Sequence, residues 1–130
     1  LRLTEAFELS ADHVFCARGV FEDWYRARAL RELPMRVEGV AVRMQVRPGP
    51  VRLTGARARW GSCSPDGTIR LNWRLVLAPE RIIEYVIVHE LAHLEHLDHS
   101  GRFWARVEKA MPDHRDAVQW LKQHGHELNV

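Results

Sequence analysis

Apolar residues recur at intervals of three and four through the first third of the chain. This spacing predicts a helix over residues 11–32. Pro34 suits the first turn of a second helix, because its missing N–H is not needed there. The second helix has apolar residues at i, i+3, i+4 and i+7, namely Val37, Val40, Ala41 and Met44. We therefore expect two helices before a turn at Arg47-Pro48-Gly49-Pro50.

Residues 68–75 alternate between apolar and polar side chains, which is typical of a half-buried strand. One face carries Ile69, Leu71, Trp73 and Leu75, and the other carries Thr68, Arg70, Asn72 and Arg74. Residues 51–60 favour a second extended segment. Ser64-Pro65-Asp66-Gly67 lies between the two and has strong turn chemistry. The pattern predicts an antiparallel hairpin over residues 51–75.

The next helix begins at Pro79 and is apolar over most of its surface, which indicates burial at the centre of the domain. Two shorter helices are expected over residues 100–110 and 113–124, separated by Met111-Pro112. The predicted fold class is α+β, with a small antiparallel hairpin or sheet packed against about five helices. A chain of 130 residues fits a single domain, 1–130.

Composition excludes several classes of protein. The formal net charge of +2 is too small to indicate nucleic-acid binding by itself. No apolar run approaches the ~20 residues that cross a bilayer, and the amino end lacks the apolar stretch of a signal peptide. Cys16 and Cys63 show no disulfide pattern, so we expect reduced thiols and a cytoplasmic protein.

The central helix contains His89-Glu90-Leu91-Ala92-His93, an HExxH motif. Residues i and i+4 lie on one helix face, so both imidazoles can reach a single ion, and Glu90 can meet a water activated by it. These polar groups are costly to bury in an apolar helix without a function. Neutral imidazole suits zinc, and three protein ligands leave one position open for water. The motif predicts one catalytic zinc ion with Glu90 as general base.

The third ligand must come from outside the motif. His99 follows His93 by six residues, which is the spacing of the HExxHxxGxxH signature. His96 occupies the glycine position of that signature and is itself an alternative ligand. Glu108, on the following helix, is another. We expect His99 to complete the site, and the residues alone leave both alternatives open.

Several short motifs follow one another in the order and spacing of a known family. They are Trp60-Gly61-Ser62-Cys63, Leu71-Asn72, the HExxH stretch, His99-Ser100 followed by Phe103-Trp104, and Met111-Pro112-Asp113. From about residue 15 onward the sequence resembles the YgjP-like metallopeptidase domain, a relative of the SprT and Spartan proteases. The resemblance implies a zincin-like core, zinc ligands His89, His93 and His99, and a catalytic Glu90. Members usually carry a strand-rich segment before the first helix, and this sequence is expected to lack it.

Four further residues are candidates for contacts with substrate or with the metal ligands. Trp60 could shape a turn that lines the cleft, and Asn72 could bind a substrate backbone. Tyr85 lies one turn before His89 and could stabilise an oxyanion. Asp98 could orient a ligand from behind.

The expected activity is hydrolysis of a protein or peptide substrate by a metal-activated water, with Glu90 as general base. An alternative from another class is a metal-containing module that binds nucleic acid or protein and has little hydrolytic activity. The arginines that would contact phosphates are Arg57, Arg59, Arg70 and Arg74. A zinc hydrolase for a non-peptide bond is a third possibility, because HExxH fixes the chemistry better than the substrate.

Overall fold

The computed structural model describes residues 11–55 and 59–124. The described part contains four α-helices, one 3-10 helix and three short strands. In chain order they are α2 (Ala11–Met44), β1 (Val51–Thr54), β2 (Gly61–Cys63), β3 (Ile69–Asn72), the 3-10 helix η1 (Trp73–Leu77), α3 (Glu80–Ala92), α4 (Gly101–Ala110) and α5 (His114–His124). Among the described residues, no helix is both long enough and apolar enough to cross a membrane.

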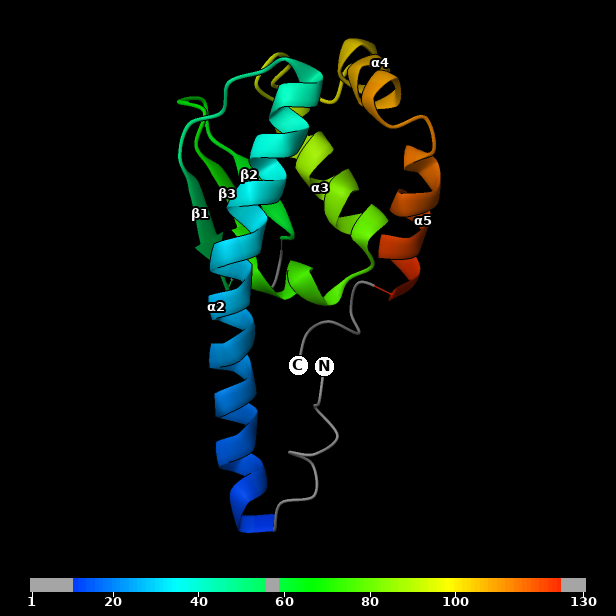
Figure 1. Ribbon diagram of the computed structural model, residues 1–130. Helices are drawn as coiled ribbons and strands as arrows, with labels where there is room; N and C mark the ends of the chain where they lie inside the picture. Colours follow the sequence, from blue (N-terminus) through cyan, green and yellow to red (C-terminus); the bar gives the residue numbers. More distant parts are fainter. Residues whose placement is uncertain (1–10, 56–58, 125–130) are drawn as a thin grey trace.

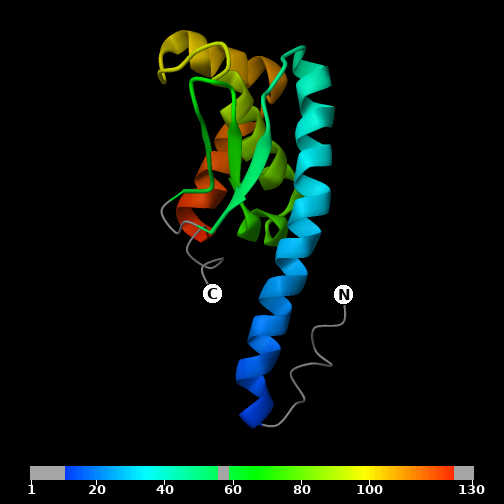
Figure 2. The ribbon, with the colours of Figure 1, turned by 90° about the vertical axis from the view of Figure 1, so that its left-hand side faces the viewer.

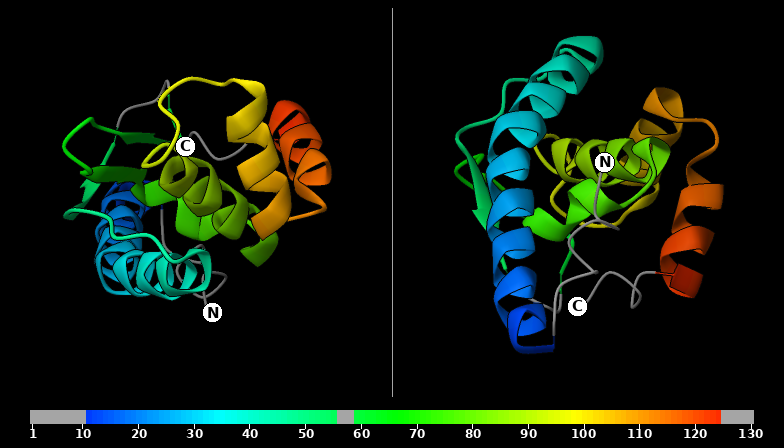
Figure 3. Two further views of the ribbon diagram at one scale, coloured as in Figure 1. Left: turned by 90° about the horizontal axis from the view of Figure 1, so that it is seen from above. Right: turned by 60° about the horizontal axis from the view of Figure 1, so that its bottom comes forward.

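The elements form a sheet layer and a helical layer (Figures 1 and 2). Seen from above, α3 lies in the middle, with the sheet and α2 on one side and α4 and α5 on the other (Figure 3). The residues of α3 that are fully buried include Ile82, Ile87, Val88 and Leu91. The predicted α+β class and the central position of the HExxH helix are therefore confirmed.

The first two predicted helices are one. Helix α2 continues through Pro34 from Ala11 to Met44, so the expected break at that residue is wrong. The reason lies in the buried stripe of the helix, whose members repeat every three or four residues across the proline: Tyr25, Ala29, Leu33, Val37, Ala41 and Met44. Burial of this uninterrupted stripe offsets the hydrogen bond that proline removes.

The sheet is mixed, and the predicted antiparallel hairpin over residues 51–75 is wrong in its pairing. The strand order is β1-β3-β2. Strand β1 runs parallel to β3, with Val51 opposite Ile69, whereas β2 runs antiparallel to β3, with Gly61 opposite Leu71. The hairpin is therefore the shorter one between β2 and β3. Its turn was predicted correctly and includes Gly67, whose φ of 90° favours glycine.

The predicted strand over residues 68–75 ends at Asn72, where the chain enters η1. The Asn72 side chain accepts a hydrogen bond from the backbone N–H of Arg74 and caps this 3-10 helix. Its amide also donates to the carbonyl of Arg59. Asn72 and Arg74 are both buried, so they do not form the exposed polar face that alternation predicted.

Candidate metal centre

The last turn of α3 places two imidazoles of the HExxH motif side by side. His89 lies within the helix and His93 is its C-cap, and their ring centroids are 5.1 Å apart. The helix ends here, since the residues after Ala92 form turns rather than a further helical segment. His96 therefore lies beyond the helix, not on the ligand face one turn after His93.

The loop between α3 and α4 returns His99 to the same point. Nε2 of His99 lies 3.4 Å from Nε2 of His89. Together with His93 these residues form a group whose ligand atoms all lie within 4.8 Å of one another. Ser100 follows as the N-cap of α4, and its backbone N–H donates to the Asp98 carboxylate over 3.3 Å. The Asp98 carboxylate thus contacts the backbone of the loop that carries His99.

Hydrogen bonds to Nδ1 hold two of the three rings, on the side away from Nε2. The Tyr85 hydroxyl lies 3.2 Å from Nδ1 of His89. The backbone carbonyl of His96 lies 3.0 Å from Nδ1 of His93. Both contacts engage Nδ1 and leave Nε2 available to bind a metal ion, and such outer partners fix the ring orientation of metal-binding histidines. His96 thus contributes its carbonyl, and not its imidazole, to this arrangement.

Aromatic residues of α4 support the rings. Phe103 is fully buried and stacks on His93 with ring centroids 4.4 Å apart. Trp104 stacks on His99 at a centroid distance of 6.1 Å and on His114 at 5.8 Å. Phe103 and Trp104 therefore pack directly against the candidate metal ligands.

Glu90 faces the sheet in a confined position. Its side chain is buried, with 7% of its surface exposed. Burial raises the pKa of Glu90 to about 7, and the nearby positive charge of Arg59 opposes the shift. A Cβ placed on Gly61 would lie 3.1 Å from Cγ of Glu90 and 3.0 Å from the carbonyl oxygen of Arg70. A side chain larger than hydrogen at the start of β2 would thus crowd Glu90.

The environment of His89 favours the neutral imidazole. Burial, and then the charges of His93 and His99, lower the pKa of His89 to about 4. Neutral imidazole is the form that binds metal ions. His89 is therefore held in its neutral, ligand-competent form at neutral pH.

Three imidazoles at this spacing fit a zinc ion. Two nitrogens bound tetrahedrally at about 2.1 Å from zinc lie about 3.4 Å apart, which matches the separation of Nε2 in His89 and His99. His96 and Glu108 are not members of the group that the described residues form. The geometry thus favours His99 over both alternatives.

The other sequence candidates lie at varying distances from this centre. Trp60 is half-buried against the core, and its carbonyl accepts a hydrogen bond from the backbone N–H of Asn72. The side-chain amide of Asn72 donates to the carbonyl of Arg59 and accepts from the backbone N–H of Arg74, and its proposed contact with a substrate backbone stays a prediction. Burial raises the pKa of the Cys63 thiol, as does the negative charge of Glu90, and a raised pKa is the property of an inert thiol.

Sequence reasoning missed two features of the site. One is the carbonyl of His96, since no pattern of side chains reports a backbone contact. The other is the close approach of Gly61 to Glu90. A signal for the second was present, because a glycine in a strand often marks a point where another group comes close.

Known metallopeptidases are similar to this chain in fold. The crystal structure of the metallopeptidase zymogen of Pyrococcus abyssi abylysin is similar, with a TM-score of 0.63 and 26% identity over 70% of this chain and 93% of that chain. The metallopeptidase zymogen of Methanocaldococcus jannaschii jannalysin has a similar fold, with a TM-score of 0.62 and 18% identity over 72% of this chain and 96% of that one. No curated protein matches the sequence. The model of the YgjP-like metallopeptidase domain matches residues 10–124, and the chain therefore belongs to that family of metallopeptidases.

Proposed function

We propose that this chain is a zinc-dependent metallopeptidase in which His89, His93 and His99 hold one zinc ion and Glu90 is the general base. The observation that carries the proposal is the convergence of three imidazoles beside the buried carboxyl group of Glu90, whose pKa is about 7 in the metal-free protein. Zinc, when bound, would polarise a peptide carbonyl and make a water molecule more acidic. The remaining steps belong to residues of the chain.

Glu90 is suited to transfer a proton in both directions. A group whose pKa lies near the working pH can accept a proton and give it up again at low cost. Glu90 would take a proton from the attacking water and deliver it to the leaving amine. Its position next to His89 in α3 keeps it close to the metal ligands without making it one of them.

Strand β2 offers a place for an extended substrate. It lies at the edge of the sheet, and Gly61 brings it against Glu90. An extended peptide can add to such an edge through backbone hydrogen bonds. We therefore propose a protein or peptide segment in extended conformation as the substrate, aligned along β2 with its scissile bond at Glu90.

Removal of the metal tests the proposed activity. The protein is expected to cleave members of a peptide library, to lose this activity in 1,10-phenanthroline, and to regain it when zinc is added. Mass spectrometry of the digest is the measurement, and the non-chelating 1,7 isomer is the control. Absence of any cleavage by zinc-loaded protein would favour the alternative of a binding module. Of the arginines expected to contact phosphates in that module, Arg74 is buried and Arg57 lies outside the described residues.

Tyr85→Phe tests how the first ligand is oriented. With Nε2 of His89 directed at zinc, Nδ1 carries the proton and donates it to the Tyr85 hydroxyl, 3.2 Å away. Loss of this partner is expected to weaken zinc binding about 10- to 100-fold. Competition with a fluorescent zinc chelator measures the affinity. Tyr25→Phe is the matched control, because Tyr25 is a buried tyrosine of α2; equal affinities in the two variants would argue against the role.

A further inference from the structure

Two buried N–H groups, on residues that are next to each other in the sequence, have no acceptor among the described residues. Among the described residues, Nε1 of Trp73 and Nε of Arg74 are buried side-chain atoms without a hydrogen-bond partner. Trp73 is 3% exposed and Arg74 is 5% exposed. Burial of a donor without an acceptor is costly, and for a charged group the cost is larger. Both donors therefore indicate an acceptor that the described residues do not supply.

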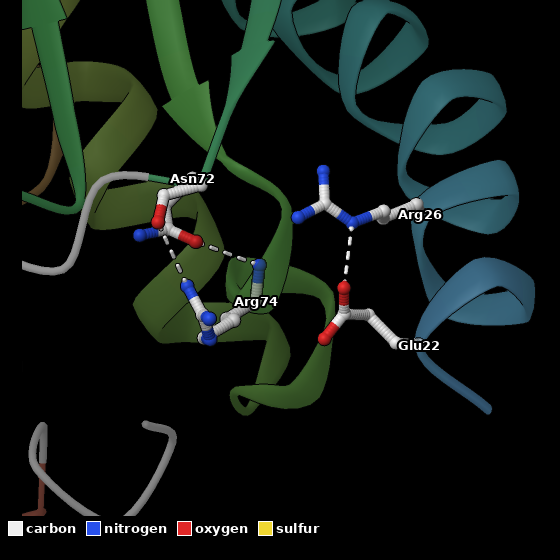
Figure 4. A network of polar contacts seen from close by, with 5 residues as sticks. Glu22, Arg26, Asn72 and Arg74 are labelled. Atoms are coloured by element: carbon white, nitrogen blue, oxygen red, sulfur yellow. Dashed lines mark hydrogen bonds and ion pairs between the residues drawn. The ribbon is translucent and has the colours of Figure 1, made fainter. Parts of the chain in front are cut away.

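The charge of Arg74 also has no ion-pair partner in the part of the chain that the structure describes. One guanidinium nitrogen donates to the carbonyl of Gly55 over 3.3 Å (Figure 4). The guanidinium carbon lies 4.7 Å from the centroid of the Trp73 ring. The ion pairs found in the described part of the chain do not include Arg74. Among residues 11–55 and 59–124, the buried guanidinium of Arg74 therefore contacts a carbonyl and an indole ring but has no ion-pair partner.

A second guanidinium approaches the same place from α2. Arg26 lies over the Trp73 ring, 5.1 Å from its centroid, and its Nε pairs with Glu22 at 3.3 Å. Figure 4 shows its side chain reaching from α2 toward the segment that carries Arg74. A Cβ placed on Gly55 would lie 3.1 Å from Nη2 of Arg26 and 3.7 Å from Nε1 of Trp73. Gly55 and Arg26 are both exposed, so the outer side of this cluster faces solvent, whereas Nε1 of Trp73 and Nε of Arg74 are buried.

We propose that Arg26, Trp73 and Arg74 form a binding site for an oxyanion beside Gly55. Guanidinium groups donate paired hydrogen bonds to the oxygens of carboxylate and phosphate, and the indole N–H adds a further donor. The ligand is therefore a small anion with at least two acceptor oxygens, and phosphate has enough oxygens to meet all three groups at once. The occupant joins α2 to the end of β1 and the start of η1.

Calorimetric titration with inorganic phosphate at constant ionic strength tests the site. Wild-type protein is expected to bind phosphate saturably and acetate more weakly, because acetate has only two oxygens. Arg26→Gln is expected to weaken phosphate binding at least tenfold, since it removes a charged donor, and thermal unfolding of the variant checks that this change at an exposed position leaves the protein folded. Arg31→Gln, an exposed arginine of the same helix, is the matched control and is expected to bind as the wild type does. Arg74→Lys is the second variant and should also weaken binding.

Two results would overturn the proposal. One is the absence of saturable phosphate binding in the wild type, or equal binding in the Arg26 and Arg31 variants. The other is loss of phosphate binding in 1,10-phenanthroline, which would assign the anion to a bound metal ion. Binding that persists in the chelator and depends on Arg26 would establish the site independently of any peptidase activity.

Discussion

Replacing Glu90 with glutamine is expected to lower peptide hydrolysis by about 100- to 10,000-fold and to leave zinc binding intact. The amide cannot accept a proton from water, and general-base catalysis typically contributes a factor of this size. The shape of the side chain is preserved, so the contact with Gly61 and the positions of His89 and His93 are unaffected. Turnover of a fluorogenic peptide and metal content, measured on one preparation, check the prediction.

The same substitution is expected to stabilise the metal-free protein at pH 8. The pKa of Glu90 is raised from 4.5 to about 7, so its ionisation in the folded state is unfavourable by an amount on the order of 3 kcal/mol. A neutral amide avoids this cost. Chemical denaturation of metal-free wild type and variant gives the difference in free energy of unfolding. Glu108→Gln, at an exposed position, is the control and should change neither activity nor stability.

The pH dependence of this effect has a defined sign. Because the folded-state pKa of Glu90 is raised, the folded metal-free protein binds more protons than the unfolded chain between pH 4.5 and 7, and Glu90 lowers stability as pH rises through that window. His89 acts in the opposite direction, because its pKa falls from 6.5 to about 4 and stability rises with pH between these values. The two nearly cancel in the wild type. Stability of Glu90→Gln should therefore rise between pH 4 and 6.5, and a profile parallel to that of the wild type would contradict the account.

Local patterns predicted several elements well. The apolar residues of α3 and the proline and serine before α3 and α4 placed these helices to within one or two residues. The turn before β3 was predicted because Gly67 and its polar neighbours have few other conformations available. These features depend on nearby residues, so the sequence contains what is needed to find them.

The pairing of the strands and the burial of individual polar side chains were less predictable from the sequence. Alternation in residues 68–75 identified the buried face of β3, but it carries no information on which strands lie beside it. Strand β2 is three residues long and has no apolar pattern. Whether α2 continues through Pro34 is decided by contacts with the rest of the fold. Burial of Arg74 likewise runs against the usual exposure of arginine.

In the candidate site too, features that depend on local sequence could be predicted, and features that depend on the tertiary fold could not. The i, i+4 spacing of His89 and His93 is a local property of a helix, and it placed both rings on one face. The position of His99 depends on the path of the loop from the end of α3 to Ser100, so spacing could not exclude His96. Tyr85 was predicted to lie near the ligands, and it does, but its hydroxyl contacts the back of His89 instead of the open side of the site.

His99 and His96 are the two histidine candidates for the third zinc ligand, and their substitution leads to opposite predictions for zinc affinity. His99→Ala removes one of three converging ring nitrogens, so two imidazoles remain and zinc affinity is expected to collapse. His96→Ala removes an imidazole that belongs to no metal-binding group in the described residues, and it keeps the backbone carbonyl that lies 3.0 Å from Nδ1 of His93. The two substitutions delete the same side chain from the same loop, which makes each the matched control of the other.

Metal content by plasma mass spectrometry, on wild type, His99→Ala and His96→Ala purified without added metal, tests the proposed zinc site most directly. We predict near-stoichiometric zinc in the wild type and in His96→Ala, and a small fraction of that amount in His99→Ala. Retention of zinc by His99→Ala with loss in His96→Ala would contradict the assignment of the third ligand. Absence of zinc from the wild type, even after reconstitution, would contradict the zinc-dependent mechanism itself.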